Sequence, residues 1–188
     1  MTQPIRITSR YAPRDVGIGI VHIGLGAFHR AHQACYIEAV LNRHNGGDWG
    51  ICAANIRSNR MIVEQLEAQA YRYHVVDFAG RDSARVTEVQ SIRRALFAGN
   101  DAGALLDQMT CAETRIVTLT VTEKGYYLSP ASGQLLTDAP AIAADIATPE
   151  SPYTAPGIVL EALRRRRDAG FAPFTVLCCD NMPNNGAR

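Results

Sequence analysis

The sequence feature that most constrains the fold is a short apolar run that ends in a glycine turn and leads into a helical pattern. Residues 18–23 form an apolar run of strand length, and Gly24 and Gly26 follow it directly. Over residues 28–43 the apolar positions recur at helical spacing, which stops at Asn45 and the two glycines after it. A strand, a tight turn and a helix in this order predict a βαβ unit, in which helices pack on parallel strands.

The rest of the chain continues this alternation with one interruption. Residues 49–56 predict a second strand and residues 60–70 a helix. Two β-rich runs at 71–78 and 85–92, separated by turn residues 79–82, predict a hairpin inserted into the alternation. Further expected elements are a helix at 101–109, a strand at 115–121, a long Pro- and Gly-rich excursion at 122–156, a helix at 157–169 and a strand at 174–179.

The glycine turn has the context of a dinucleotide-binding turn, because it follows a strand and opens a helix in the first βαβ unit. Gly24 allows the tight turn, and Gly26 lets the backbone approach a pyrophosphate at the helix N-terminus. Arg30 adds a cation in the first helical turn. The fingerprint is incomplete, since its third glycine position is His29. A turn that merely connects strand and helix is the alternative.

These observations predict an α/β protein with a Rossmann-type, mostly parallel sheet, helices on both faces and an inserted β-hairpin. Residues 1–17 are expected to be an irregular leader, because Pro4, Pro13 and Gly17 interrupt regular structure. Residues 18–188 are expected to form the dinucleotide-binding domain. Because the chain ends after a strand that a helix would normally cover, we expect it to be the N-terminal part of a longer protein.

The end of the second expected strand bears on the choice between NAD and NADP. An acidic residue there would bind the ribose 2′-hydroxyl of NAD, but residues 55–60 contain none. The uncharged Asn59, between Arg57 and Arg60, would tolerate a 2′-phosphate, so NADP, or the use of both cofactors, is a hypothesis. The alternative is that both arginines are solvated charges at the entry of a helix.

The composition argues against several classes of partner. Of the 188 residues, 47% are hydrophobic and 20% charged, which is typical of a globular chain. A net charge of +1 gives no electrostatic reason to expect nucleic acid or an anionic membrane, and the run from Arg164 to Arg167 is interpreted as a solvated helix face. No apolar run reaches the ~18 residues of a membrane span. Five cysteines without a Cys-x-x-Cys pair favour a reducing, cytoplasmic location.

One possible metal site arises from His29, His32 and Cys35, which follow one another at i, i+3 steps along the first expected helix. Each step drifts about 60° around the helix axis, so the three side chains do not converge well. The positive end of the helix dipole also disfavours a cation near His29. We therefore expect no metal.

Four segments together resemble the long-chain mannitol dehydrogenase family, which includes mannitol 2-dehydrogenase, fructuronate reductase (mannonate oxidoreductase), tagaturonate reductase and arabinitol dehydrogenase. They cover nearly the whole chain in the family's order. With residues 131–135, the third segment resembles the fructuronate reductase branch more than the mannitol branch. The segments are Ile20-Val-His-Ile-Gly-Leu-Gly-Ala-Phe-His-Arg-Ala-His-Gln33, Asp48-Trp-Gly-Ile-Cys52, Thr120-Val-Thr-Glu-Lys-Gly-Tyr126 and Cys179-Asp-Asn-Met-Pro-Asn-Asn-Gly186.

The resemblance implies a Rossmann-type cofactor domain followed by a mostly helical C-terminal domain that is absent from this chain. It also implies zinc-independent hydride transfer between NAD or NADP and a sugar alcohol or sugar acid, of the mannitol/fructose or mannonate/fructuronate type. The general-base lysine would lie beyond this chain. Family members place the residue matching Asn181 beside the substrate oxygen. Asn181 also follows a strand at the end where open α/β sheets bind ligands, so its amide can polarise that oxygen.

The site residues follow from the glycine turn and the resemblance together. An Asx turn at Asn181 and strand-end capping at 120–123 are the structural alternatives. Two functional alternatives are a non-catalytic dinucleotide-binding module and a methyltransferase, whose adenosine-containing cofactor also suits a glycine turn. We expect Gly24, Leu25, Gly26, Ala27, Phe28 and Arg30 at the pyrophosphate, Asn59 at the ribose, and Thr120, Thr122 and Glu123 at the nicotinamide.

Overall fold

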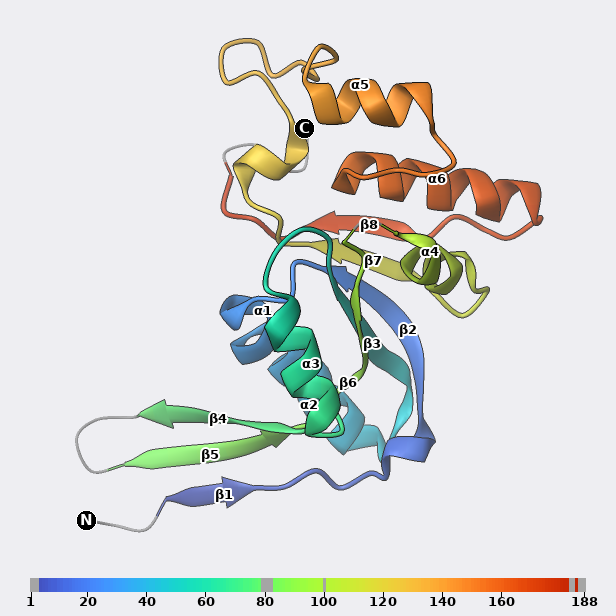
Figure 1. Cartoon of the computed structure of the whole chain (residues 1–188). Helices are drawn as coiled ribbons and strands as arrows, with labels where there is room; N and C mark the ends of the chain where they lie inside the picture. Colours follow the sequence, from blue (N-terminus) through green and yellow to red (C-terminus); the bar gives the residue numbers. More distant parts are fainter. Residues whose placement is uncertain (1–3, 79–82, 100, 183–184, 186–188) are drawn as a thin grey trace.

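The structure is a computed structural model and describes residues 4–78, 83–99, 101–182 and 185. The hairpin turn predicted at 79–82 lies outside the described residues. The elements follow one another along the chain as β1 (Ile5–Ile7), η1 (Pro13–Asp15), β2 (Val16–Ile23), α1 (Ala27–Ala31), α2 (Gln33–His44), β3 (Gly47–Asn55), α3 (Arg60–Ala68), β4 (Tyr73–Phe78), β5 (Ala84–Val89), β6 (Ile92–Phe97), α4 (Gly103–Thr110), β7 (Ile116–Leu119), η2 (Glu123–Tyr126), α5 (Pro140–Ala147), α6 (Ala155–Asp168) and β8 (Thr175–Cys178) (Figure 1).

The central layer is a five-stranded sheet in the order β6-β3-β2-β7-β8, and all its neighbouring strands pair in parallel. β2, which ends in the glycine turn, lies in the middle of this sheet. The chain winds from β2 to β3 and β6 on one side, and then to β7 and β8 on the other. Helices α2 and α3 cover one face, and α4 and α6 cover the other (Figure 1). The predicted Rossmann-type α/β fold is therefore confirmed.

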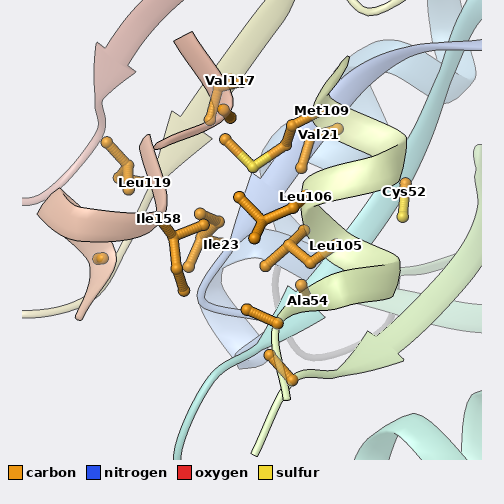
Figure 2. Close-up of a cluster of buried hydrophobic side chains, with 14 of the residues drawn as sticks. Val21, Ile23, Cys52, Ala54, Leu105, Leu106, Met109, Val117, Leu119 and Ile158 are labelled. Atoms are coloured by element: carbon orange, nitrogen blue, oxygen red, sulfur yellow. The ribbon is translucent and has the colours of Figure 1, made fainter. Parts of the chain in front are cut away.

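Alternating side chains of the buried strands supply two hydrophobic cores, one on each face of the sheet. In β2, Ile20 packs among residues of α2 and α3, whereas Val21 and Ile23 pack among residues of α4 and α6. Figure 2 shows the second cluster, in which Ile23 of β2, Leu106 of α4 and Ile158 of α6 lie together. Because helices cover both faces, these strands are apolar at nearly every position. That is why the sequence pattern identified them.

The predicted hairpin is present as β4 and β5, which pair in an antiparallel arrangement. It belongs to a separate three-stranded sheet in the order β1-β5-β4, in which β1 is parallel to β5. The segment 1–17 is therefore not an irregular leader throughout, since it contains β1 and the start of β2 at Val16. The hydroxyl of buried Tyr11 donates to the Glu38 carboxylate at 2.6 Å, which anchors this segment to α2.

Strand β6 was not predicted separately. The sequence predicts one strand through residue 92, but β5 ends at Val89 and the chain then enters the main sheet. At the junction, the backbone N–H of Gln90 donates to the Glu38 carboxylate at 2.8 Å, and the Ser91 hydroxyl donates to the Ala34 carbonyl at 2.8 Å. Contacts with α2, about 50 residues earlier, thus divide a β-rich run that looks continuous in the sequence.

Two helices also differ from expectation. The helix predicted at 28–43 is divided at His32, whose φ of −123° and ψ of −84° are not helical. The excursion at 122–156 contains α5, which begins at Pro140. Proline is compatible with the first helical position, because the N–H that it lacks would have no partner there. The prolines of this segment therefore did not exclude a helix.

The arginine run of α6 is not a uniformly solvated face. Arg166 is buried, and its guanidinium donates to the carbonyl oxygens of Met109 at 3.1 Å and Ala172 at 2.7 Å. Arg164 and Arg165 instead pair with the buried Glu161, each at 2.7 Å. The correction arises from tertiary contacts, because the fold brings the Met109 carbonyl at the end of α4 within reach of the Arg166 guanidinium.

Candidate functional site

A pocket of about 380 Å³ opens at the carboxyl ends of β2, β3 and β7, where the winding of the sheet reverses. Open α/β sheets bind ligands at this point. Six residues expected at the cofactor lie in its wall, whereas Ala27, Phe28, Arg30, Glu123 and Asn181 lie outside the lining. The six are Gly24, Leu25, Gly26, Asn59, Thr120 and Thr122.

Gly24 makes the tight turn after β2. Its φ of +114° lies in the region that glycine adopts readily and other residues avoid, and a Cβ there would collide with the Thr120 carbonyl oxygen. Its N–H donates to the Ala54 carbonyl at 2.8 Å, and its own carbonyl accepts the Thr120 hydroxyl at 2.9 Å. The turn is therefore fixed to β3 on one side and to β7 on the other.

Gly26 has a different role in the geometry. It precedes α1 with an extended backbone, and a Cβ there would have the Gly24 carbonyl oxygen at 3.7 Å as its nearest neighbour. A ligand in the pocket can therefore approach this backbone closely. α1 has only 5 residues, so it has no long helix dipole. An anion would instead bind the unpaired N–H groups of the first turn of α1. The Arg30 side chain folds back and donates from Nε to the Gly26 carbonyl at 3.2 Å.

Two residues of α1 are absent from the pocket lining. Ala27 and Phe28 are both exposed, and the Phe28 ring stacks on His32 with 4.8 Å between ring centroids. Their backbone N–H groups belong to the first turn of α1. Their side chains therefore contribute nothing to the pocket wall, and any contact with a phosphate would come from the backbone.

The end of β3 places an arginine between two aromatic rings. The Arg57 guanidinium lies 5.4 Å from the centroid of the Tyr127 ring and 4.6 Å from that of Tyr153. Cation–π contacts of this kind hold the guanidinium in place and leave its N–H groups free to donate. Arg60, by contrast, pairs with Glu64 at 2.9 Å.

Asn59 lies between these two arginines in a left-handed backbone conformation, with φ of 59°. It is exposed, and its side chain makes no capping hydrogen bond to α3. The Asn59 amide is therefore available at the pocket rim, without the negative charge that an acid would bring.

Two buried histidines support the glycine turn from behind. The rings of His22 and His29 stack with 3.5 Å between centroids and 7° between their planes. Nε2 of His22 lies 3.0 Å from the Gly24 carbonyl oxygen, which can only accept, so that nitrogen carries the proton. Burial lowers the pKa of both rings, to about 4 for His29. Both are neutral at pH 7 and act through packing and neutral hydrogen bonds.

The segment after β7 reaches the edge where β8 ends. Thr122 has φ of 68° and ψ of 161°, a combination that residues other than glycine rarely adopt and that costs about 1–3 kcal/mol. Glu123 follows it, exposed, as the first residue of η2. Asn181 is exposed just beyond Asp180, whose carboxylate accepts the Val121 N–H at 2.9 Å. The structure thus brings Thr122 and Asn181 to one edge, with Asn181 outside the pocket.

Sequence reasoning missed four polar residues that hold this site together. Asn55, for example, donates from Nδ2 to the Leu25 carbonyl at 3.2 Å and so ties β3 to the glycine turn. Their position in the sequence was the available signal. Each lies near the end of a strand or in the segment after it. An apolar residue would pack there equally well, so a polar residue indicates a hydrogen-bonding role. The four are His22, Asn55, Tyr126 and Asp180.

The described residues contain neither a metal-binding cluster nor a membrane-spanning helix. Within those ranges, no group of three or more His, Cys, Asp and Glu side chains gathers in a way that could hold a metal ion. The same ranges contain no helix that is both long and apolar enough to cross a membrane.

A parallel sheet in this strand order, with a glycine turn at its switch point, defines a dinucleotide-binding domain of Rossmann type. The chain belongs to the mannitol dehydrogenase family. The family model described as the mannitol dehydrogenase Rossmann domain matches residues 18–188.

Individual relatives and a solved structure agree with this assignment. The uncharacterized oxidoreductase YeiQ of Escherichia coli is 47% identical over 178 residues, which cover 94% of this chain and 36% of that protein. The D-mannonate oxidoreductase of Escherichia coli is 43% identical over 170 residues, covering 89% of this chain and 35% of that enzyme. The Pseudomonas fluorescens mannitol 2-dehydrogenase, solved as a ternary complex with NAD and D-mannitol, superposes with a TM-score of 0.92 at 41% identity and covers 97% of this chain and 37% of that one. The chain thus spans little more than a third of the length of these proteins.

Proposed function

We propose that this chain is the cofactor domain of a dehydrogenase that transfers hydride between NAD and a sugar alcohol or sugar acid. The observation that carries the proposal is the pocket at the switch point of the sheet, with Gly24 and Gly26 in its wall. Gly24 fixes the turn, and the open space beside Gly26 admits a pyrophosphate against the backbone. The similarity to a structure that contains NAD supports the same cofactor.

The residues present suit a nicotinamide dinucleotide. The first-turn N–H groups of α1 at Ala27 and Phe28 would bind the pyrophosphate, and Arg30 would contribute positive charge beside it. Thr120, Thr122 and Glu123 would border the nicotinamide half. When bound, the nicotinamide supplies the hydride acceptor or donor, a chemistry that protein side chains lack.

The substrate would meet this domain at the exposed edge beyond β8. There the Asn181 amide would donate to the substrate oxygen and stabilise the charge that develops on it. A general-base lysine and the remaining substrate contacts would come from a helical C-terminal domain, since this chain matches only 35–36% of the length of these relatives. The mannitol/fructose and mannonate/fructuronate reactions are both compatible with these residues.

We further propose that the site accepts NADP as well as NAD. Asn59 brings no negative charge to the pocket rim, and Arg57 is held between two tyrosines with its N–H groups free. A 2′-phosphate would therefore meet a cation and no acid. Arg60 is less available for this role, because Glu64 already pairs with it.

The first experiment is a titration of the 188-residue chain with NADH and NADPH, followed by isothermal calorimetry and by the fluorescence of the reduced nicotinamide. Saturable binding of NADH supports the cofactor-domain proposal. A folded chain that binds neither nucleotide contradicts it and favours a site that is complete only with further protein.

The cellular location proposed is the cytoplasm. All five cysteines are free thiols in the structure, and Cys111 is exposed. Exposed thiols of this kind persist in a reducing compartment. Measuring the free thiols of the protein isolated from cells under alkylating conditions tests this proposal, since oxidised cysteines would contradict it.

A further inference from the structure

Asp180 is placed where it can hold one wall of the candidate cofactor pocket. Its Oδ2 accepts the backbone N–H of Val121 at 2.9 Å and the hydroxyl of Tyr126 at 2.7 Å. Its Oδ1 lies 3.2 Å from the backbone nitrogen of Thr122, which donates to it. One carboxylate at the end of β8 therefore binds two successive amides and one side chain of the segment that follows β7.

The segment that Asp180 binds has an unfavourable conformation. Thr122, with φ of 68° and ψ of 161°, lies in a region used almost only by glycine. Such a conformation persists only where the surrounding contacts fix it. The turn at Thr122 directs the chain into η2 and places Lys124 and Gly125 in the pocket wall. If Thr122 relaxed to an ordinary conformation, this wall would move.

Tyr126 contributes a second contact to the same carboxylate. Its hydroxyl lies 2.9 Å from the Cys178 sulfur and donates to Asp180, so the two strand ends are joined by a chain of hydrogen bonds. Burial is the main reason that the pKa of Tyr126 is raised, with the contacts to Cys178 and Asp180 adding to it. The phenol thus keeps its proton and remains a donor.

We propose that Asp180 is a positioning residue for the cofactor site: its carboxylate holds Val121 and Thr122 in the conformation that forms the pocket wall, and so couples this wall to Asn181 next in sequence. The inference rests on the proposed function, since it assigns the held wall to nicotinamide dinucleotide binding. Asp180 acts through this wall, because both of its carboxylate oxygens already accept hydrogen bonds from it.

The test compares Asp180→Asn with a matched control, Glu38→Gln. Glu38 also accepts one backbone N–H, from Gln90, and one tyrosine hydroxyl, from Tyr11, in addition to the side chains of Ser9 and Asn42. It is not among the residues that line the pocket. Both variants replace a carboxylate by an amide of the same size. Each is first shown to be folded by circular dichroism and urea unfolding, and then titrated with NADH.

We expect Asp180→Asn to raise the Kd for NADH about tenfold or more, because charge-assisted hydrogen bonds to the wall are lost. Glu38→Gln should leave this Kd within about twofold of the wild-type value. The decisive measurement is a double-mutant cycle with Thr122→Gly. Glycine adopts the backbone conformation of Thr122 without strain, so Asp180→Asn should cost at least about threefold less in the Thr122→Gly background than in the wild-type background.

Amide hydrogen exchange without nucleotide separates this inference from the proposed function. In Asp180→Asn the amides of Val121 and Thr122 should exchange about tenfold faster or more, while in Glu38→Gln they should not change. Unchanged exchange in Asp180→Asn overturns the inference, whether or not NADH binds. An equal loss of NADH affinity in Asp180→Asn and Glu38→Gln, or a cycle without coupling, also overturns it. A wild-type chain that binds no NADH contradicts the proposed function alone, and the exchange rates then decide the role of Asp180.

Discussion

The two glycines of the turn after β2 should respond to the same substitution in opposite ways. Alanine at Gly24 must adopt φ of +114°, and its methyl group would collide with the Thr120 carbonyl oxygen. Alanine at Gly26 keeps an ordinary extended backbone and has its nearest neighbour at 3.7 Å. Gly24→Ala should therefore damage the fold, and Gly26→Ala should damage only nucleotide binding.

The magnitudes follow from these contacts. For Gly24→Ala, backbone strain costs about 1–3 kcal/mol, and losing the hydrogen bond from the Thr120 hydroxyl to the displaced carbonyl adds about 1 kcal/mol. Relief of the collision adds to both, so the free energy of unfolding should fall by at least ~3 kcal/mol. For Gly26→Ala, the poorer N-cap costs up to about 1 kcal/mol, and the reduced entropy of the unfolded chain offsets about 0.4–1 kcal/mol.

The assay pairs urea unfolding, followed by circular dichroism, with NADH titration of both variants. We expect Gly26→Ala to unfold within about 0.5 kcal/mol of wild type and to bind NADH at least tenfold more weakly, because a methyl group blocks the approach of the pyrophosphate to the backbone. Wild-type affinity in Gly26→Ala would refute the placement of the pyrophosphate. Wild-type stability in Gly24→Ala would refute the argument from close approach.

Three further predictions concern pH, the core and cofactor choice. The free energy of unfolding should fall as pH drops from 6.5 towards 4. In this range His22 and His29 bind protons in the unfolded chain but stay neutral in the folded chain. His29 alone should lower the free energy of unfolding by about 2 kcal/mol at pH 5. Urea unfolding at pH 7 and pH 5 measures this, and equal stabilities would contradict it. Leu106→Ala should lower the unfolding free energy by roughly 2–5 kcal/mol, because it opens a cavity between the sheet and α6. A loss below about 1 kcal/mol would contradict this and show that the neighbouring side chains fill the space. Asn59→Asp should raise the ratio of the Kd for NADPH to that for NADH at least tenfold, since a carboxylate repels the 2′-phosphate, and an unchanged ratio would place that phosphate elsewhere.

Much of the fold could be predicted because it depends on patterns that are local in the chain. The apolar run at β2, the glycine turn and the helical spacing after it are read directly from consecutive residues. The division of the chain at Gln90 could not be read in this way. It depends on the Glu38 carboxylate and the Ala34 carbonyl, which only the folded chain brings to Gln90 and Ser91.

The candidate site shows the same limit. The positions of Gly24 and Gly26 follow from their place between a strand and a helix. The Thr122 conformation does not, because nothing in the sequence around a threonine predicts a glycine-like backbone. It is fixed by Asp180, 58 residues further along the chain, which accepts its N–H.

The sequence by itself determined the layers of this protein, the order of its main elements and the glycine turn, since hydrophobic periodicity and glycine act within a few residues of the chain. Only the tertiary structure decided which polar side chains meet at the carboxyl edge of the sheet. Parallel strands that are far apart in sequence end side by side there, so His22 comes to lie beside Thr118, and Asp180 beside Val121. The physical reason is that a buried hydrogen-bonding group must find a partner in space, and the chain alone does not say which partner the fold will provide.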